Sequence, residues 1–156
     1  MSREAVLGAV RKALSPRPAA PALPPFLAPP SFPDLAEAFL TALRAAGGTG
    51  EISSDPGRAA GATEADFGIA ETGTVVEVSG PGRSRLASLL PEFHLVVLPV
   101  SRLRSGLGEV LSEIESRGIP GAAVTLITGP SRTADIEQVL TIGVHGPARL
   151  HVVLLR

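Results

Sequence analysis

The chain has 156 residues and a mass of 15.9 kDa, the size of one domain, and its hydrophobic fraction of 44% suits a packed core rather than a disordered chain. A net charge of −1 gives no electrostatic footprint for nucleic acid or for an anionic membrane. The sequence contains no cysteine, which excludes disulfides, thiolate zinc sites, a cysteine nucleophile and any iron–sulfur cluster held by this chain's own thiolates.

The N-terminal region is predicted to be a helix followed by an extended arm. Apolar residues recur at a spacing of three and four over residues 3–14, and the helix is expected to end before Pro16. The proline-rich stretch up to Pro33 excludes helix and central strand. Residues 1–33 are therefore interpreted as an arm and residues 34–156 as an α/β domain. The arm either packs through Phe26, Leu27 and Phe32 on the body or on a neighbouring subunit of a homo-oligomer, or is a solvated linker.

The arm carries no secretory signal, and no stretch of the sequence has the roughly 18 to 20 apolar residues of a membrane span. A cytoplasmic location is therefore predicted. The three histidines lie far apart and show no metal-ligand spacing, so no intrinsic metal site is expected.

The first part of the domain is predicted to hold one helix and a strand pair. A helix begins after Asp34 and is stopped by Gly47 and Gly48. A short strand is expected near Ile52, followed by a glycine-spaced loop with one helical turn. Two strands, over 67–70 and 74–78, are then predicted to flank a bend.

The second part alternates strands and helices. After a short helix from about Ser84, the expected elements are buried strands over 95–98, 123–127 and 150–155, and a helix over 102–117. Strand, helix and strand in this order predict parallel crossovers. The predicted fold class is α/β, with an open, mostly parallel sheet and helices on both faces.

The loop after residue 127 is the first candidate site. Gly129 and Pro130 are expected to end the strand, and Ser131 and Thr133 to cap a helix over 134–140. A strand, a tight loop and a helix N-terminus present backbone N–H groups to an anion, at the end of the sheet where ligands of α/β proteins bind. An anion site is therefore predicted there.

Four ordered blocks resemble the LUD domain of the LutC type, the lactate-utilisation protein C family. They are ADFGIAETGTVVEVS at 65–79, RLASLLPEFHLVVLP at 85–99, ITGPSRTADIE at 127–137 and GVHGPARLHVVLL at 143–155. Members of this family usually run longer between the first helix and the first block. The resemblance implies a fold similar to the NagB/RpiA/CoA-transferase group. It also implies a role beside two iron–sulfur partner proteins that oxidise L-lactate to pyruvate, with the clusters held only by those partners.

The motif positions carried over from the resemblance form two groups. Glu71 and His145 are the candidate catalytic residues. The candidate ligand-binding residues are Thr72, Gly73, Thr74, Gly129, Pro130, Ser131, Arg132, Thr133, Asp135, Glu137, Gly146 and Pro147.

Three side chains offer chemistry, and each has a structural alternative. Arg132 is suited to bidentate binding of a carboxylate or phosphate, or to an ion pair with a nearby acid. Glu71 is placed to act as a base or nucleophile, or to tie the bend through backbone N–H groups. His145 is able to move a proton or to join two loops, whereas His94 and His151 are interpreted as core or edge residues of strands.

The leading hypothesis is a subunit of lactate oxidation that holds a small anion between the 71–74 bend and the 129–137 loop. A second hypothesis is a stand-alone enzyme, similar to CoA-transferases or sugar-phosphate isomerases, that uses Glu71 chemically. A non-catalytic binding or assembly module that reaches a partner through its arm is the third.

Overall fold

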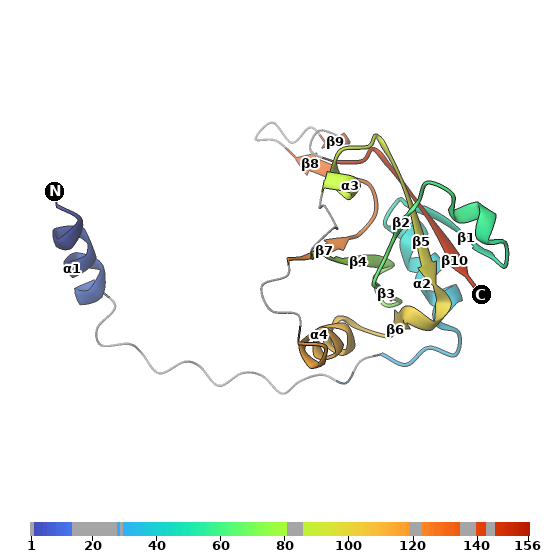
Figure 1. The fold of residues 1–156 in the computed structure, drawn as a ribbon, viewed down its shortest axis with the longest axis horizontal. Helices are drawn as coiled ribbons and strands as arrows, with labels where there is room; N and C mark the ends of the chain where they lie inside the picture. Colours follow the sequence, from blue (N-terminus) through green and yellow to red (C-terminus); the bar gives the residue numbers. More distant parts are fainter. Residues whose placement is uncertain are drawn as a thin grey trace.

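The structure is a computed structural model that describes residues 2–13, 28, 30–80, 86–118, 123–134, 140–142 and 146–156. Its helices are α1 (Arg3–Ala13), α2 (Leu35–Ala45), α3 (Leu86–Leu89) and α4 (Leu107–Ser116), with single 3-10 turns η1 (Pro56–Ala59) and η2 (Val100–Arg102) (Figure 1). Its strands are β1 (Thr49–Ser53), β2 (Thr63–Glu64), β3 (Phe67–Ile69), β4 (Thr74–Val78), β5 (Phe93–Pro99), β6 (Leu103–Arg104), β7 (Val124–Ile127), β8 (Arg132–Ala134), β9 (Leu140–Ile142) and β10 (Arg149–Leu155). No helix in this part of the chain is long and apolar enough to cross a membrane.

The strands are divided between two four-stranded sheets and a hairpin. The first sheet has the order β1-β10-β5-β2, and all of its strands run parallel. The second sheet has the order β6-β3-β4-β7 and is mixed, because β4 runs antiparallel to both β3 and β7. The α/β class and the parallel sheet are confirmed, while the division into two sheets was not foreseen.

The main core is packed between α2, the parallel sheet and β4. Phe39 and Leu43 of α2, Val75 of β4, and Val96 and Val152 of the parallel sheet are fully buried in one cluster. A smaller cluster joins β3 and β4 to α4 through Phe67 and Val110. The two cores lie on opposite faces of β4, because successive strand residues point to opposite sides.

Helix α2 follows its sequence signals closely. The Asp34 side chain accepts hydrogen bonds from the N–H groups of Ala36 (2.8 Å) and Glu37 (3.1 Å), as an N-cap does. Gly47 has a φ of 88° and ends the helix, since a left-handed residue at this position is inexpensive only for glycine. The predicted start and stop are both confirmed.

Helix α4 is shorter than predicted at its N-terminal end. The pattern indicated a helix from residue 102, but residues 100–102 form the 3-10 turn η2, and Leu103–Arg104 form β6 beside β3. Leu103 is buried against the main core rather than on the helix face. The helical spacing of Leu103 was therefore coincidental, because a strand pairing determines its position.

Strand β7 differs from the prediction in its burial. Residues 123–127 were expected to form a buried strand, but Val124 and Leu126 are 37% and 48% exposed. The strand lies at the edge of the mixed sheet, and its residues alternate between exposed and half-buried.

The helix predicted over 134–140 is contradicted at its two ends, and its residues 135–139 lie outside the described residues. Ala134 ends β8 and Leu140 begins β9, and the two strands pair antiparallel with Arg132 opposite Ile142 and Thr133 opposite Thr141. Pairing across the hairpin satisfies backbone groups that a helix would have satisfied internally, and the β-branched Thr133, Thr141 and Ile142 favour a strand. The argument for an anion site at a helix N-terminus is lost with this helix.

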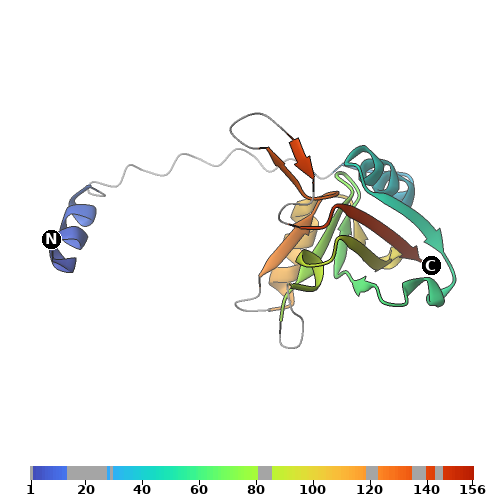
Figure 2. The same cartoon turned by 90° about the horizontal axis from the view of Figure 1, so that it is seen from above.

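Helix α1 is amphipathic, as predicted, but none of its residues is buried. Figures 1 and 2, which view the molecule along perpendicular directions, both place α1 away from the body. Its apolar residues Val6, Leu7 and Val10 are 40% to 48% exposed.

Candidate functional site

The bend between β3 and β4 lies against the C-terminal half of α2. Gly73 has a φ of 64°, and a Cβ atom there would overlap the backbone of Leu43. The Gly73 N–H group donates to the carbonyl of Ile69 at 2.9 Å and closes the turn. A glycine is thus required at this position both for its conformation and for its close approach to the helix.

A chain of threonine hydroxyls joins this bend to the end of β7. The Oγ1 atoms of Thr72 and Thr74 lie 2.7 Å apart, and Thr74 Oγ1 lies 2.7 Å from Thr128 Oγ1. The 71–74 bend and the loop after β7, predicted as two walls of one cleft, are therefore in direct contact. Thr128, which makes this contact, was not singled out in the sequence.

The loop after β7 packs on the C-terminal end of α2. Gly129 has a φ of 72°, and a Cβ atom there would overlap the Ala46 carbonyl. The Arg132 Nη2 atom donates a hydrogen bond to that same carbonyl. A guanidinium is favourable here because carbonyl groups at a helix C-terminus carry partial negative charge. Arg132 therefore has a structural contact, made to a backbone carbonyl rather than to the acids considered from sequence.

The same loop lies beside residues 146–147. The Ser131 N–H group donates to the Pro147 carbonyl at 2.9 Å, and a Cβ atom on Gly146 would lie 3.1 Å from Ser131 Cβ. Ser131 is thus held by a loop contact, and its predicted role as a helix cap is wrong.

These loops surround a pocket of about 420 Å³ between β7 of the mixed sheet and β5 and β10 of the parallel sheet. Six predicted ligand-binding residues line it: Gly129, Pro130, Ser131, Arg132, Gly146 and Pro147. The remaining lining comes from Thr125–Thr128, Leu150, His94, and Ser88 and Leu89 of α3.

The other predicted site residues lie elsewhere or outside the described residues. The pocket lining does not include Thr72, Gly73 or Thr74. Thr74 does, however, share a hydrogen bond with Thr128, which lines the pocket. Glu71 is exposed, and its N–H group donates to the Ser105 carbonyl at 3.1 Å. The side chain of Thr133 and the whole of Asp135, Glu137 and His145 fall outside the described part. A joint role of Glu71, Arg132 and His145 stays a prediction.

The pocket also contains a residue whose part in it was missed, His94. Its side chain is 1% exposed, so its interpretation as a core residue is confirmed. Its Nε2 atom lies 2.6 Å from Thr63 Oγ1 and 3.5 Å from Glu77 Oε1, whereas its Nδ1 atom is buried without a hydrogen-bond partner. A polar residue on the same strand face as Val96 and Leu98 was the signal available in the sequence.

Burial determines the charge state of His94. Desolvation lowers the pKa of the imidazole, and the nearby Glu77 carboxylate opposes this only in part. The ring is therefore neutral at pH 7. Among the described residues, no group of three or more His, Cys, Asp or Glu side chains is placed to hold a metal ion.

Comparison with known proteins identifies the family. Residues 58–155 match the family described as LUD domain. The chain belongs to the LUD-domain family. The matched region includes the two loops and every described residue that lines the pocket.

Curated relatives of this LUD-domain chain carry a functional name. The "Lactate utilization protein C" of Halalkalibacterium halodurans is 42% identical over 93 residues, which cover 57% of this chain and 40% of that protein. The protein of the same name from an Exiguobacterium species is 40% identical over 99 residues, or 61% and 43% of the two chains. These relatives confirm the resemblance to the LutC type. The chain spans less than half the length of these curated relatives.

A solved structure supports the fold. The crystal structure of a DUF162 family protein from Deinococcus radiodurans matches this LUD-domain chain with a TM-score of 0.58 at 17% identity. The match covers 78% of this chain and 96% of that chain. At this identity the likeness concerns the fold alone.

Proposed function

We propose that this LUD-domain chain acts in L-lactate utilisation and binds a small carboxylate, such as lactate or pyruvate, in the pocket between the two sheets. The role in lactate utilisation is proposed from the relatives named "Lactate utilization protein C". Binding of a carboxylate is proposed from the composition of the pocket.

The charge of the pocket lining is the observation that supports an anionic ligand. Among the described lining residues, Arg132 carries the only formal charge at neutral pH, and no carboxylate is present. The hydroxyl-bearing residues Ser88, Thr125, Thr128 and Ser131 also line the pocket. A volume of about 420 Å³ lies at the small end of the usual range for ligand pockets, which suits a small acid.

Arg132 retains the capacity to bind a carboxylate. A guanidinium has five N–H donors, and Nη2 is its only atom with a hydrogen bond to another described residue. The contact with Ala46 holds the guanidinium of this pocket-lining residue in place. A held guanidinium loses less conformational entropy when it binds a carboxylate than a mobile one does.

The proposal is tested by calorimetric titration of the full chain with L-lactate, pyruvate and the neutral amide lactamide. We expect the acids to bind and lactamide to bind much more weakly. Arg132→Ala should weaken binding of the acids roughly tenfold to a hundredfold, since a hydrogen bond to a charged group contributes about 1.5 to 3 kcal/mol. Arg132→Lys should lie between the two, because it keeps the charge and loses the fork.

The matched control is Arg58→Ala. Arg58 forms an exposed ion pair with Glu51 at 2.5 Å and does not line the pocket, so its loss should leave the affinity unchanged. Thermal unfolding of each variant separates lost binding from lost folding. Equal affinity for lactate and lactamide in the wild-type chain would refute the proposal.

The proposed system also includes partner proteins that hold iron–sulfur clusters. Because the sequence has no cysteine, clusters with thiolate ligands would have to reside in other chains. Affinity purification of the tagged chain from its native cells should therefore recover proteins with iron–sulfur absorption. Recovery of the chain alone under gentle conditions would count against this assembly.

A further inference from the structure

The core between the two sheets becomes polar where the pocket opens. On β5, His94 lies on the same face as the buried Val96, two residues further along the strand. On β4, Glu77 lies on the same face as the buried Val75. His94 and Glu77 thus place two titratable side chains next to the apolar layer that contains Val96 and Val75. Thr63 of β2 contacts both of them.

The contacts of Thr63 assign the proton on the imidazole. Thr63 Oγ1 donates to Glu77 Oε1 at 3.3 Å, because a carboxylate only accepts. A hydroxyl has one hydrogen, so Thr63 Oγ1 then accepts from His94 Nε2 at 2.6 Å. The hydrogen is therefore assigned to Nε2, which also lies 3.5 Å from Glu77 Oε1, and in the neutral ring Nδ1 is left with a lone pair.

The lone pair of Nδ1 accepts no hydrogen bond inside the protein. The residue is 1% exposed, and Nδ1 has no partner. A buried polar atom without a partner destabilises the free protein, and a ligand that supplies a hydrogen would recover this cost. His94 lines this pocket and also a second one on the side of Thr63. Because Thr63 already contacts Nε2, Nδ1 is the ring nitrogen left for a ligand in the pocket beside Arg132.

We propose that His94 is a specificity-determining residue of the pocket, accepting a hydrogen bond at Nδ1 and thereby selecting ligands that carry a hydroxyl group. This rests on the proposed function: Arg132 binds the carboxylate of the ligand, and His94 accepts from the 2-hydroxyl group. A 2-hydroxy acid supplies that hydrogen. A 2-oxo acid offers only a carbonyl oxygen, which would face the lone pair of Nδ1.

Access to Nδ1 requires part of the lining to move, because the atom is closed off from solvent. Helix α3 is a single turn, and its Leu89 lines the pocket while remaining 46% exposed. Few contacts hold such a side chain in place. We expect α3 to shift when the ligand binds.

The test measures the affinities of L-lactate and pyruvate for the wild-type chain and for His94→Leu. We expect the wild type to prefer L-lactate by roughly tenfold, since a site that hydrogen-bonds a hydroxyl group discriminates against the analogue lacking it. His94→Leu should lower this ratio to about one. His151→Leu is the matched control: His151 bonds to Thr49 Oγ1 at 2.8 Å and does not line the pocket, so the ratio should stay unchanged.

Nitrogen-15 NMR of the wild-type imidazole gives a second measurement that needs no variant. The free protein should show His94 protonated at Nε2, and L-lactate but not pyruvate should shift the Nδ1 resonance. Protonation at Nδ1 in the free protein would overturn the inference. Equal binding of the two acids to the wild type would overturn the inference alone, whereas binding of neither would overturn the proposed function as well.

Discussion

At the scale of single residues, two glycines allow the loops of the site to lie against the end of α2. Gly73 and Gly129 both have positive φ angles, and a Cβ atom would overlap the backbone of Leu43 in α2 at Gly73 and that of Ala46, just after α2, at Gly129. Their neighbours Thr74 and Thr128 then share a hydrogen bond at 2.7 Å. The positions of the two loops beside the pocket therefore depend on these two glycines.

Gly73→Ala is expected to destabilise the chain by about 3 kcal/mol or more, because strain at positive φ adds to a backbone overlap. Gly61→Ala is the matched control. Gly61 has a φ of 77° but open space where its Cβ would lie, so only the conformational cost of about 1 kcal/mol remains. Urea unfolding measures both changes. Equal losses would show that the approach to Leu43 is not tight in solution.

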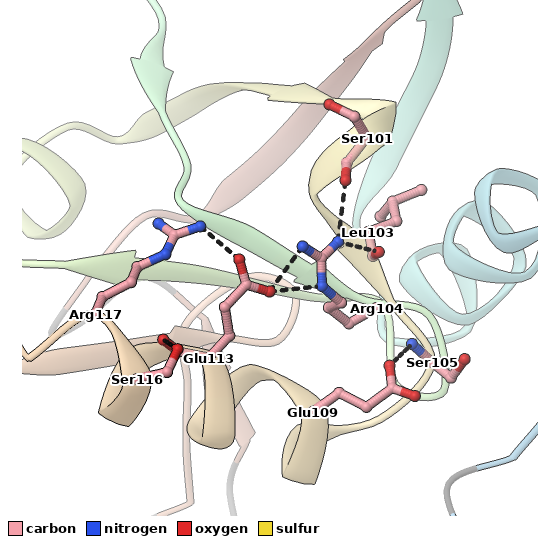
Figure 3. A network of polar contacts seen from close by, with 8 residues as sticks. All are labelled: Ser101, Leu103, Arg104, Ser105, Glu109, Glu113, Ser116 and Arg117. Carbon is pink, nitrogen blue, oxygen red and sulfur yellow. Dashed lines mark hydrogen bonds and ion pairs between the residues drawn. The ribbon is translucent and has the colours of Figure 1, made fainter.

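At the scale of elements, a network of two arginines and one glutamate fastens α4 to the mixed sheet (Figure 3). Glu113 of α4 accepts from Arg104 at 2.7 Å and from Arg117 at 2.5 Å. Both guanidinium groups also lie over the ring of the buried Phe67, at 5.7 and 4.6 Å from its centre. The helix is thus held by charge contacts as well as by Val110.

The pKa of Glu113 gives this network a pH dependence. Burial raises the pKa, but the hydrogen bonds from Arg104 and Arg117 outweigh it and hold the pKa below its usual 4.5. A carboxylate with a lowered folded-state pKa contributes stability above about pH 4.5, and this contribution is lost as the pH falls through the folded-state value.

Glu113→Gln should therefore lower the free energy of unfolding by about 1 to 2 kcal/mol at pH 7 and by less at pH 3. Glu115→Gln, on the exposed side of the same helix, should have almost no effect at either pH. Urea midpoints at the two pH values measure both. A cost of Glu113→Gln that does not change with pH would contradict this account of the network.

The elements also show which sequence signals were sufficient. Asp34 and Gly47 specify the ends of α2 by local chemistry, and the antiparallel pair around Glu71–Gly73 follows from β-branched residues on either side of a turn. The helix prediction failed at Ala134 and Leu140 because capping residues and apolar spacing resemble a helix. The pairing of β8 with β9, which no local pattern records, places both residues in strands.

At the scale of the whole molecule, α1 contributes no buried residue to the body. Removing residues 1–13 should change the free energy of unfolding by less than about 0.5 kcal/mol. A chain that starts at residue 34 also loses Phe32, which packs against the main core, and should be less stable by about 1 to 2 kcal/mol. Chemical unfolding of the two truncated chains decides this. A large loss on removing residues 1–13 alone would mean that α1 has a partner in solution.

The sequence by itself determined the family, the α/β class and the identity of the loop that lines one side of the pocket, because these depend on local motifs and on their order. Only the tertiary structure decided that the strands form two sheets, and that the pocket lies between them. It also brought Thr63, Glu77 and His94 together from three strands, separated by 14 to 31 positions in the chain. Packing decides whether a buried atom such as His94 Nδ1 has a hydrogen-bond partner. No sequence pattern reveals that an atom has been buried without one.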